Sequence, residues 1–264
     1  MKKKKPNQKR SPQGRVHEWV ALDKAAWQYH LDQWDNPKRS TLRFAEFLQP
    51  LLTRSKKVVD VGCGGGGATA YLAGQYPQVQ VLGVDYSKAL VAAANDLKDR
   101  RGIANLAFEP GDWYKLKPRK DVSGVLSIHT IMGLPGFERP LLEIFRRIAP
   151  EWIGLSSLFY PGDISVRCEV EEHGRRKCFY NAYSIPAVDR FARQHGYQMS
   201  AVAPFDIDVD IPLPANRDVM GTYTVATAQP SDGVPQRIQI SGPLLMNWHF
   251  VTLTRTAAKA RVRK

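Results

Sequence analysis

The chain has little cysteine and no long apolar run, and both absences narrow what it can be. Its 264 residues include only 3 cysteines, which are odd in number and lack metal-ligand spacing. No stretch approaches the roughly 18 uninterrupted apolar residues of a membrane helix. The basic N-terminus lacks the apolar segment of a secretory signal. We therefore expect a reduced, cytoplasmic protein with no membrane insertion and no bound metal.

Net charge is scarce in the part of the chain that is expected to fold. The total is +13, but residues 1–15 hold seven Lys or Arg and residues 255–264 hold five, with no acid in either segment. Residues 16–254 keep 26 Lys and Arg against 25 Asp and Glu, so a basic groove across the folded body is not expected. The two tails suit RNA, an anionic membrane surface or an acidic partner, or they serve solubility alone.

These composition changes predict one domain between two tails. The expected segments are a disordered basic tail at 1–15, a single domain at 16–254 with a helical cap at 16–52 and insertions at 159–183 and 213–246, and a basic tail at 255–264. No internal repeat is present.

A glycine-rich turn between two predicted strands is the feature around which the chain is organised. Residues 58–61 are valine except for Asp60, five glycines fall within positions 62–67, and a second apolar run ends at Asp85. This order predicts two neighbouring parallel strands with a crossover helix. Glycine allows close approach of a ligand, and the helix N-terminus offers unpaired N–H groups. Asp85 is expected at the ligand-binding edge, where its carboxylate can accept both hydroxyls of a ribose.

The glycines fit two cofactor motifs. Gly62, Gly64 and Gly67 match the dinucleotide fingerprint G-x-G-x-x-G. The run DVGCGGG at residues 60–66 resembles instead the D-x-G-x-G-x-G signature of class I S-adenosylmethionine-dependent methyltransferases. Asp60, two residues before the first glycine, suits a cofactor with a sulfonium and an ammonium and not a pyrophosphate. A glycine turn that binds no ligand is the remaining alternative.

The resemblance covers residues 40–160 and implies S-adenosylmethionine as the cofactor. Family members often carry an acid after the third strand, near the adenine amine, and Asp112 matches this position, with Trp113 placed to pack on the base. Asp112 can equally be an ordinary turn residue. The cofactor-binding residues expected from the resemblance are Asp60, Gly62, Cys63, Gly64, Gly66, Asp85, Tyr86, Asp112, Trp113 and Ile128.

Strand and helix patterns alternate along the chain and predict an α/β fold. Further strands are expected at 104–108, 121–127, 152–158, 197–211 and 248–254, and helices at 88–101, 137–148 and 185–196, with Ser87 and Ser184 as helix caps. The result is a doubly wound, mostly parallel seven-stranded sheet, and the resemblance makes its last strand antiparallel. Predicted hairpins at 164–183 and 221–240 are insertions that can wall a substrate pocket.

The N-terminal part, residues 16–52, is expected to form two helices, the second capped by Ser40 or Thr41. In class I methyltransferases such helices commonly close over the cofactor. Tyr29, and Trp34 in an exposed-looking turn, are therefore candidates for a lid. Both can equally be core residues of the helical layer.

Methyl transfer requires few catalytic side chains, because the cofactor already carries a good leaving group at its sulfonium. The protein mainly supplies proximity and alignment. A base is needed only where an acceptor proton must leave. His129, just after the fourth strand, is the candidate base, with a structural hydrogen bond as the alternative; Tyr160 and His249 are further candidates.

Two side-chain clusters fall on the predicted insertions. The acids and histidine of the first hairpin indicate a solvated charged turn and not a metal site: Glu169, Glu171, Glu172 and His173. The aromatic residues that line either the substrate pocket or the core are Tyr180, Tyr183 and Trp248.

The function expected from these features is methyl transfer to a small-molecule acceptor, a sugar or a natural-product intermediate, by in-line displacement. One alternative is methylation of RNA or protein held by the basic tails, so nucleic acid stays open as a partner. Others are an NAD-dependent oxidoreductase, against which Asp60 and Asp112 argue, and a non-catalytic binding module. The sequence predicts no oligomeric state.

Overall fold

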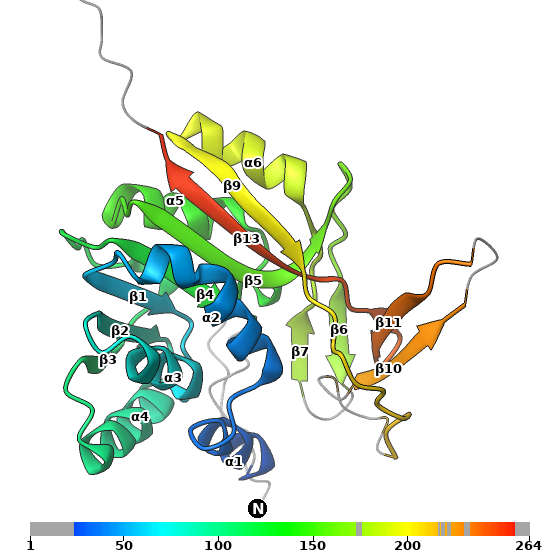
Figure 1. Ribbon diagram of the computed structural model, residues 1–264, viewed down its shortest axis with the longest axis horizontal. Coiled ribbons are helices and arrows are strands. Elements are labelled where there is room, and N and C mark those ends of the chain that lie inside the picture. The colour runs from blue at the N-terminus through cyan, green and yellow to red at the C-terminus, as the bar shows by residue number, and fades with distance from the viewer. Residues whose placement is uncertain are drawn as a thin grey trace, which may run out of the picture.

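The computed structural model describes residues 24–256 except 173–175, 216, 218–219, 221–222 and 230–232. Its centre is a sheet whose members are β1 (Lys57–Val61), β2 (Gln80–Asp85), β3 (Leu106–Pro110), β4 (Gly124–Ile128), β5 (Trp152–Tyr160), β8 (Tyr183–Ser184), β9 (Tyr197–Pro204) and β13 (Trp248–Arg255). In space the order is β3-β2-β1-β4-β5-β13-β9, and β8 adds a short pair to β5. The glycine turn follows β1, the central strand of the parallel part (Figure 1).

Neighbouring strands from β3 to β5 are parallel, whereas β13 runs antiparallel to both β5 and β9. The predicted doubly wound, mostly parallel sheet with an antiparallel last strand is therefore confirmed. One boundary differs: β9 ends at Pro204 and not at residue 211, because the chain leaves the sheet there. Beyond this point the N–H of Ile207 donates to Gln239 Oε1 at 3.0 Å, outside the main sheet.

Helices cover both faces of the sheet: α1 (Lys24–Asp32), α2 (Arg39–Leu52), α3 (Gly67–Gln75), α4 (Lys88–Arg101), α5 (Glu138–Arg147), α6 (Ile185–Gln194), and the short 3-10 helices η2 (Trp113–Lys115) and η3 (Ile131–Gly133). Side chains of α2, α3 and α4 form one core layer with Val58, and those of α5 and α6 form the other with Val59. Adjacent residues of one strand point to opposite faces, so β1 is buried on both sides.

Two of the three predicted helix N-caps are found in the structure, and the third is not. Ser87 and Ser184 accept hydrogen bonds from the N–H groups of Leu90 and Ala187, as predicted. The prediction that Ser40 or Thr41 caps the second helix is wrong. Lys38 is the N-cap residue, and both hydroxyl residues are buried inside α2, where packing overrides their capping preference.

Both predicted insertions contain hairpins. The first pairs β6 (Glu169–Glu172) with β7 (Arg176–Phe179), and its tip, with His173, lies outside the described residues. The second joins β10 (Tyr223–Ala228), β11 (Gln236–Ser241) and β12 (Leu244–Leu245). In Figure 1 the β10–β11 hairpin projects to the right of the main sheet.

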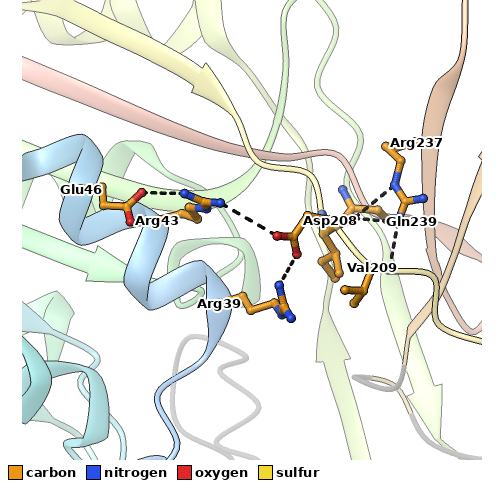
Figure 2. A network of polar contacts seen from close by, with 8 residues as sticks. Arg39, Arg43, Glu46, Asp208, Val209, Arg237 and Gln239 are labelled. Carbon is orange, nitrogen blue, oxygen red and sulfur yellow. Dashed lines mark hydrogen bonds and ion pairs between the residues drawn. The ribbon is translucent and has the colours of Figure 1, made fainter.

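A polar network connects α2 to the second insertion (Figure 2). Arg39 of α2 forms an ion pair with Asp208, and Arg43 lies 3.9 Å from the same carboxylate. From the other side, Arg237 of β11 donates to the carbonyls of Ile207 and Val209, both at 2.8 Å. The segment after β9 is thus held between α2 and β11.

The three cysteines are free thiols. Among the described residues, no helix combines the length and the apolar character needed to cross a membrane.

Candidate active site

The turn from β1 into α3 has a backbone that glycine adopts readily. Gly62 has φ +80°, and Gly66, the N-cap of α3, has φ +82°. A Cβ on Gly62 would overlap the side chain of Thr130. The N–H groups of Gly62 and Cys63 donate to the Val84 carbonyl at 2.7 and 3.2 Å. The turn therefore lies across the carboxyl end of β2, at the edge where open parallel sheets bind ligands.

Asp60 is buried in β1, directly before this turn. It is 1% exposed, and Thr69 Oγ1 donates to its Oδ2 at 2.7 Å. Its Oδ1 has no partner among the described residues. Burial raises the pKa of Asp60 to about 7; the Thr69 hydrogen bond opposes this rise and the Asp85 charge adds to it. A buried carboxylate oxygen without a donor fits a cationic group such as the ammonium of S-adenosylmethionine.

Asp85 ends β2 and faces the same turn. Its Oδ2 accepts a hydrogen bond from Gly64 N–H, and its Oδ1 accepts one from Ser87 N–H, both at 2.8 Å. Burial raises the pKa of Asp85, and these backbone hydrogen bonds oppose the rise. Each oxygen accepts one of these bonds and keeps further acceptor capacity. The carboxylate is thus held in a fixed plane, suited to a pair of ribose hydroxyls.

Cys63 lies between these two acids. Burial, then the charges of Asp85 and Asp60, raise the pKa of its thiol well above the ordinary value. The thiol is therefore protonated and is no nucleophile at neutral pH. Cys63 can therefore contribute to a cofactor site only through the space its side chain fills and through its backbone.

The loop after β4 is tied to the glycine turn. Ser127 Oγ donates to the Val61 carbonyl at 2.8 Å, and Thr130 Oγ1 donates to the Gly62 carbonyl at 3.0 Å. Ile128, the half-buried last residue of β4, lies between these two contacts in the sequence. Two predicted parts of the site, after β1 and after β4, therefore meet.

His129 has an unusual backbone and an unpaired ring nitrogen. Its φ is +56°, which is strained for a non-glycine residue, and its N–H donates to the Ser156 carbonyl at 2.8 Å. The ring centroid lies 4.3 Å from that of Trp248, and Nε2 has no partner among the described residues. Burial, and then the positive charge of Lys38, hold the pKa of His129 well below its ordinary value. The ring is therefore neutral at pH 7.

The residues expected around the adenine have different surroundings. Asp112 caps η2 by accepting from the Tyr114 N–H at 2.8 Å. Trp113 is buried in the core layer of α5, where its Nε1 donates to the Pro140 carbonyl at 2.9 Å. Tyr86, directly after Asp85, is half exposed. Their assignment to cofactor binding stays a prediction.

The N-terminal helices lie directly on the glycine turn. A Cβ on Gly64 would lie 3.2 Å from the His30 ring. The expectation of an exposed Trp34 is wrong: the side chain is 8% exposed, and its Nε1 donates to the Gly65 carbonyl at 2.6 Å. Arg101 of α4 lies over the Trp34 ring at 5.3 Å. Trp34 thus anchors the cap to the turn, a contact between residues 31 positions apart that no local pattern indicates.

Aromatic residues from three separate segments come together beside the cap. Burial raises the pKa of the Tyr223 phenol in β10, and Tyr180 and Tyr29 act on it as well. Tyr180 follows β7, and Tyr29 belongs to α1. Tyr180 and Tyr223 also pack against the core cluster that contains Trp248, so both insertions contribute to one aromatic wall.

The remaining candidates lie elsewhere. Tyr183 is in the core, where its hydroxyl donates to the Leu134 carbonyl at 2.8 Å, and Tyr160 is exposed. His249 is on β13, next to Trp248. Glu171 pairs with Lys177 at 3.0 Å, and Glu172 accepts from the Met220 N–H at 2.7 Å. The described residues contain no group of three or more His, Cys, Asp or Glu able to hold a metal.

Comparison with known proteins identifies the family of this site. Residues 52–198 match the family described as a methyltransferase domain. The chain belongs to that family. The methyltransferase family expected from the DVGCGGG run is confirmed, and with it S-adenosylmethionine as the cofactor, whose ammonium and ribose Asp60 and Asp85 fit.

Curated relatives of the chain include two named trans-aconitate 2-methyltransferases. The methyltransferase of Deinococcus radiodurans is 35% identical over 121 residues, which are 45% of each chain. That of Mycobacterium tuberculosis is 34% identical over 105 residues, 39% of this chain and 38% of its own. The chain thus spans less than half the length of the curated relatives it matches.

Solved structures share the fold at lower identity. The 1,6-didemethyltoxoflavin-N1-methyltransferase of Burkholderia thailandensis, solved with S-adenosylhomocysteine, has a TM-score of 0.58 and 16% identity, covering 94% of this chain and 93% of its own. An O-methyltransferase of a Brevibacillus brevis multienzyme has a TM-score of 0.56 and 14% identity, covering 94% and 82%.

Several residues at this edge are missed by sequence reasoning. His30, Thr69 and Lys38 carry no motif. His30 lies against Gly64 of the turn, Thr69 donates to Asp60, and Lys38 acts electrostatically on His129. Thr69 alone has a local signal, since it lies nine residues after Asp60 in the helix that follows the glycine turn.

Proposed function

We propose that the chain transfers the methyl group of S-adenosylmethionine to a small-molecule acceptor. The observation that carries the proposal is the placement of a buried acid, Asp60, and a partly buried acid, Asp85, beside the glycine turn. Asp60 offers an unpaired Oδ1, and Asp85 is fixed by two backbone N–H groups. A nicotinamide cofactor would bring a pyrophosphate to this turn, where Asp60 would repel it.

The roles of the chain's own residues follow from this arrangement. When bound, S-adenosylmethionine supplies an electrophilic methyl group. Asp60 and Asp85 orient the cofactor by its charge and its ribose, and the cap with Trp34 covers the turn and excludes water. The aromatic wall of Tyr29, Tyr180 and Tyr223 positions the acceptor. Alignment of this kind supplies up to roughly 7–11 kcal/mol of rate enhancement.

The low pKa of His129 bears on the acceptor class. An effective general base has a pKa near the working pH, and burial holds that of His129 well below it. An acceptor that is already ionised needs no base, so the site favours a carboxylate over a hydroxyl. The names of the trans-aconitate relatives support the same class. We therefore take a small organic acid as the acceptor, in place of a sugar. His129 then shapes the site beside Trp248.

Calorimetric titration with S-adenosylmethionine, S-adenosylhomocysteine and NAD tests the cofactor. The first two are expected to bind, and Asp85→Ala is expected to weaken them about 10- to 100-fold, because hydrogen bonds to a charged group are lost. Asp96→Ala, which removes an exposed acid from α4, is the matched control and should bind as the wild type does.

Binding of NAD alone would overturn the proposal. Unchanged S-adenosylmethionine affinity in Asp85→Ala would contradict the role given to Asp85.

A further inference from the structure

Lys38 lies between the two helices of the cap, α1 and α2, and carries a positively charged ammonium group. Its Nζ lies 4.7 Å from the centre of the Tyr29 ring, an arrangement that stabilises an ammonium group. No carboxylate of the described residues forms an ion pair with it. A half-buried charge of this kind costs free energy unless a ligand or solvent compensates it.

The other charged side chains close to Lys38 in the sequence have polar partners of their own. Arg39 binds Asp208, Arg43 binds Glu46 at 3.0 Å, and Asp35 binds Arg101 at 2.9 Å. Asp32 accepts a hydrogen bond from Gln28 at 2.7 Å. Among the described side chains of the cap, Lys38 is thus the basic group left without an acidic partner.

Lys38 lies beside the glycine turn, because the Tyr29 ring under its ammonium is 5.9 Å from the His30 ring, which a Cβ on Gly64 would approach to 3.2 Å. Its charge lowers the pKa of both His30, to about 4, and His129, with burial as the larger cause in each. His30 contacts Gly64 of the turn, and His129 follows β4. A cofactor held by Asp60 and Asp85 would present its methyl group beside this turn, so an acceptor would approach it here. Tyr29, beneath the ammonium, belongs to the aromatic wall.

We infer that Lys38 binds a carboxylate of the acceptor other than the one that is methylated. The inference rests on the proposed function and narrows its acceptor to a di- or tricarboxylic acid. If the Lys38 ammonium paired with the attacking carboxylate oxygen, that oxygen would be a poorer nucleophile. The carboxylate bound by Lys38 and the carboxylate that is methylated therefore occupy different positions in the site.

The transfer balances without a proton acceptor. An oxygen of the free carboxylate forms a bond to the methyl carbon as the carbon–sulfur bond breaks, and the electron pair of that bond stays on sulfur. The methylated carboxylate group becomes a neutral ester, the other carboxylates of the acceptor stay ionised, and the sulfonium becomes a neutral thioether.

Kinetics with two acids of different charge test the inference. For wild type, Lys38→Gln and Lys38→Arg, kcat/KM is measured with trans-aconitate and with crotonate, which has a single carboxylate. Lys38→Gln should lower kcat/KM for trans-aconitate about 10- to 100-fold through KM, with kcat and the crotonate value almost unchanged. Lys38→Arg should recover most of the loss. Arg146→Gln removes an exposed charge from the last turn of α5 and should match the wild type.

An equal loss for both acids, or none, would overturn the inference. Unchanged S-adenosylhomocysteine binding in Lys38→Gln would exclude misfolding as the cause of a loss. If the wild type methylates neither acid, then neither trans-aconitate nor crotonate is its acceptor. Calorimetric titration of trans-aconitate into the S-adenosylhomocysteine complex then tests whether Lys38 binds a carboxylate. Binding at least tenfold weaker in Lys38→Gln than in the wild type supports the inference. Equal binding in the two proteins, or no binding in either, rejects it.

Discussion

The carboxylate of Asp60, which we propose binds the cofactor, lowers the stability of the unliganded protein. It is buried with one oxygen unpaired, and its pKa in the folded state is about 7 against 3.8 as the ordinary value. The folded protein therefore holds the proton over a pH range in which the unfolded chain has released it. Stability falls as the pH rises through this range, and the full penalty, on the order of 4 kcal/mol, is present above pH 7.

Asp60→Asn removes this penalty while keeping an oxygen that can accept from Thr69. Without cofactor, the variant should gain stability over the wild type by about 2–3 kcal/mol more at pH 8 than at pH 5. Urea unfolding at the two pH values measures the difference. In Asp96→Asn, which changes an exposed acid, the gap should be the same at both pH values. A constant gap for Asp60→Asn would show that the residue does not titrate in this range.

At the scale of elements, the glycine turn depends on backbone conformation as much as on ligands. Gly62→Ala places a Cβ at φ +80° and against Thr130, so we expect a loss of roughly 1–3 kcal/mol of stability and weaker S-adenosylmethionine binding. Gly74→Ala, within α3, meets nothing within 4 Å and should stabilise the protein by about 0.5–1 kcal/mol. Thermal unfolding of both variants is the measurement. Equal effects would show that the turn places no special demand on residue 62.

The elements that could be predicted from the sequence are those whose evidence is local. The valine run before the glycines, the Ser87 cap and the hairpin patterns all predict neighbours within a few residues, and the structure follows them. The burial of Trp34 and the position of Lys38 depend on segments far along the chain. Such positions are determined by tertiary packing, which a local sequence pattern does not specify. The same holds for Trp113, whose partner is the Pro140 carbonyl on α5.

At the scale of the whole molecule, we expect the basic tails to be dispensable for methyl transfer to a small acceptor. Arg255, which the sequence analysis assigns to the second tail, is the last residue of β13, and its guanidinium donates to the Ala149 carbonyl at 2.9 Å. A truncation that respects this contact removes residues 1–15 and 257–264. We expect methylation of small acids to stay within about twofold of the full chain, because residues 16–254 carry the site and are nearly neutral.

Binding of single-stranded RNA, measured by anisotropy at two salt concentrations, should be weak and lost on this truncation. Salt-sensitive RNA binding that survives truncation would show a basic surface on the folded body. A fall in methylation of small acids would show that the tails take part in the reaction.

The position of β13 also bears on how the protein is made. This strand lies between β5 and β9, yet it follows both in the chain. While the ribosome is still adding the second insertion, β9 has no partner along its inner edge, and β5 has an open edge where β13 will lie. Strands β1 to β4 can assemble earlier, but β5 and β9 are joined into one sheet only when residues 248–255 emerge from the ribosome. Nascent chains stalled before this strand should therefore be bound by chaperones and cut by proteases at β9.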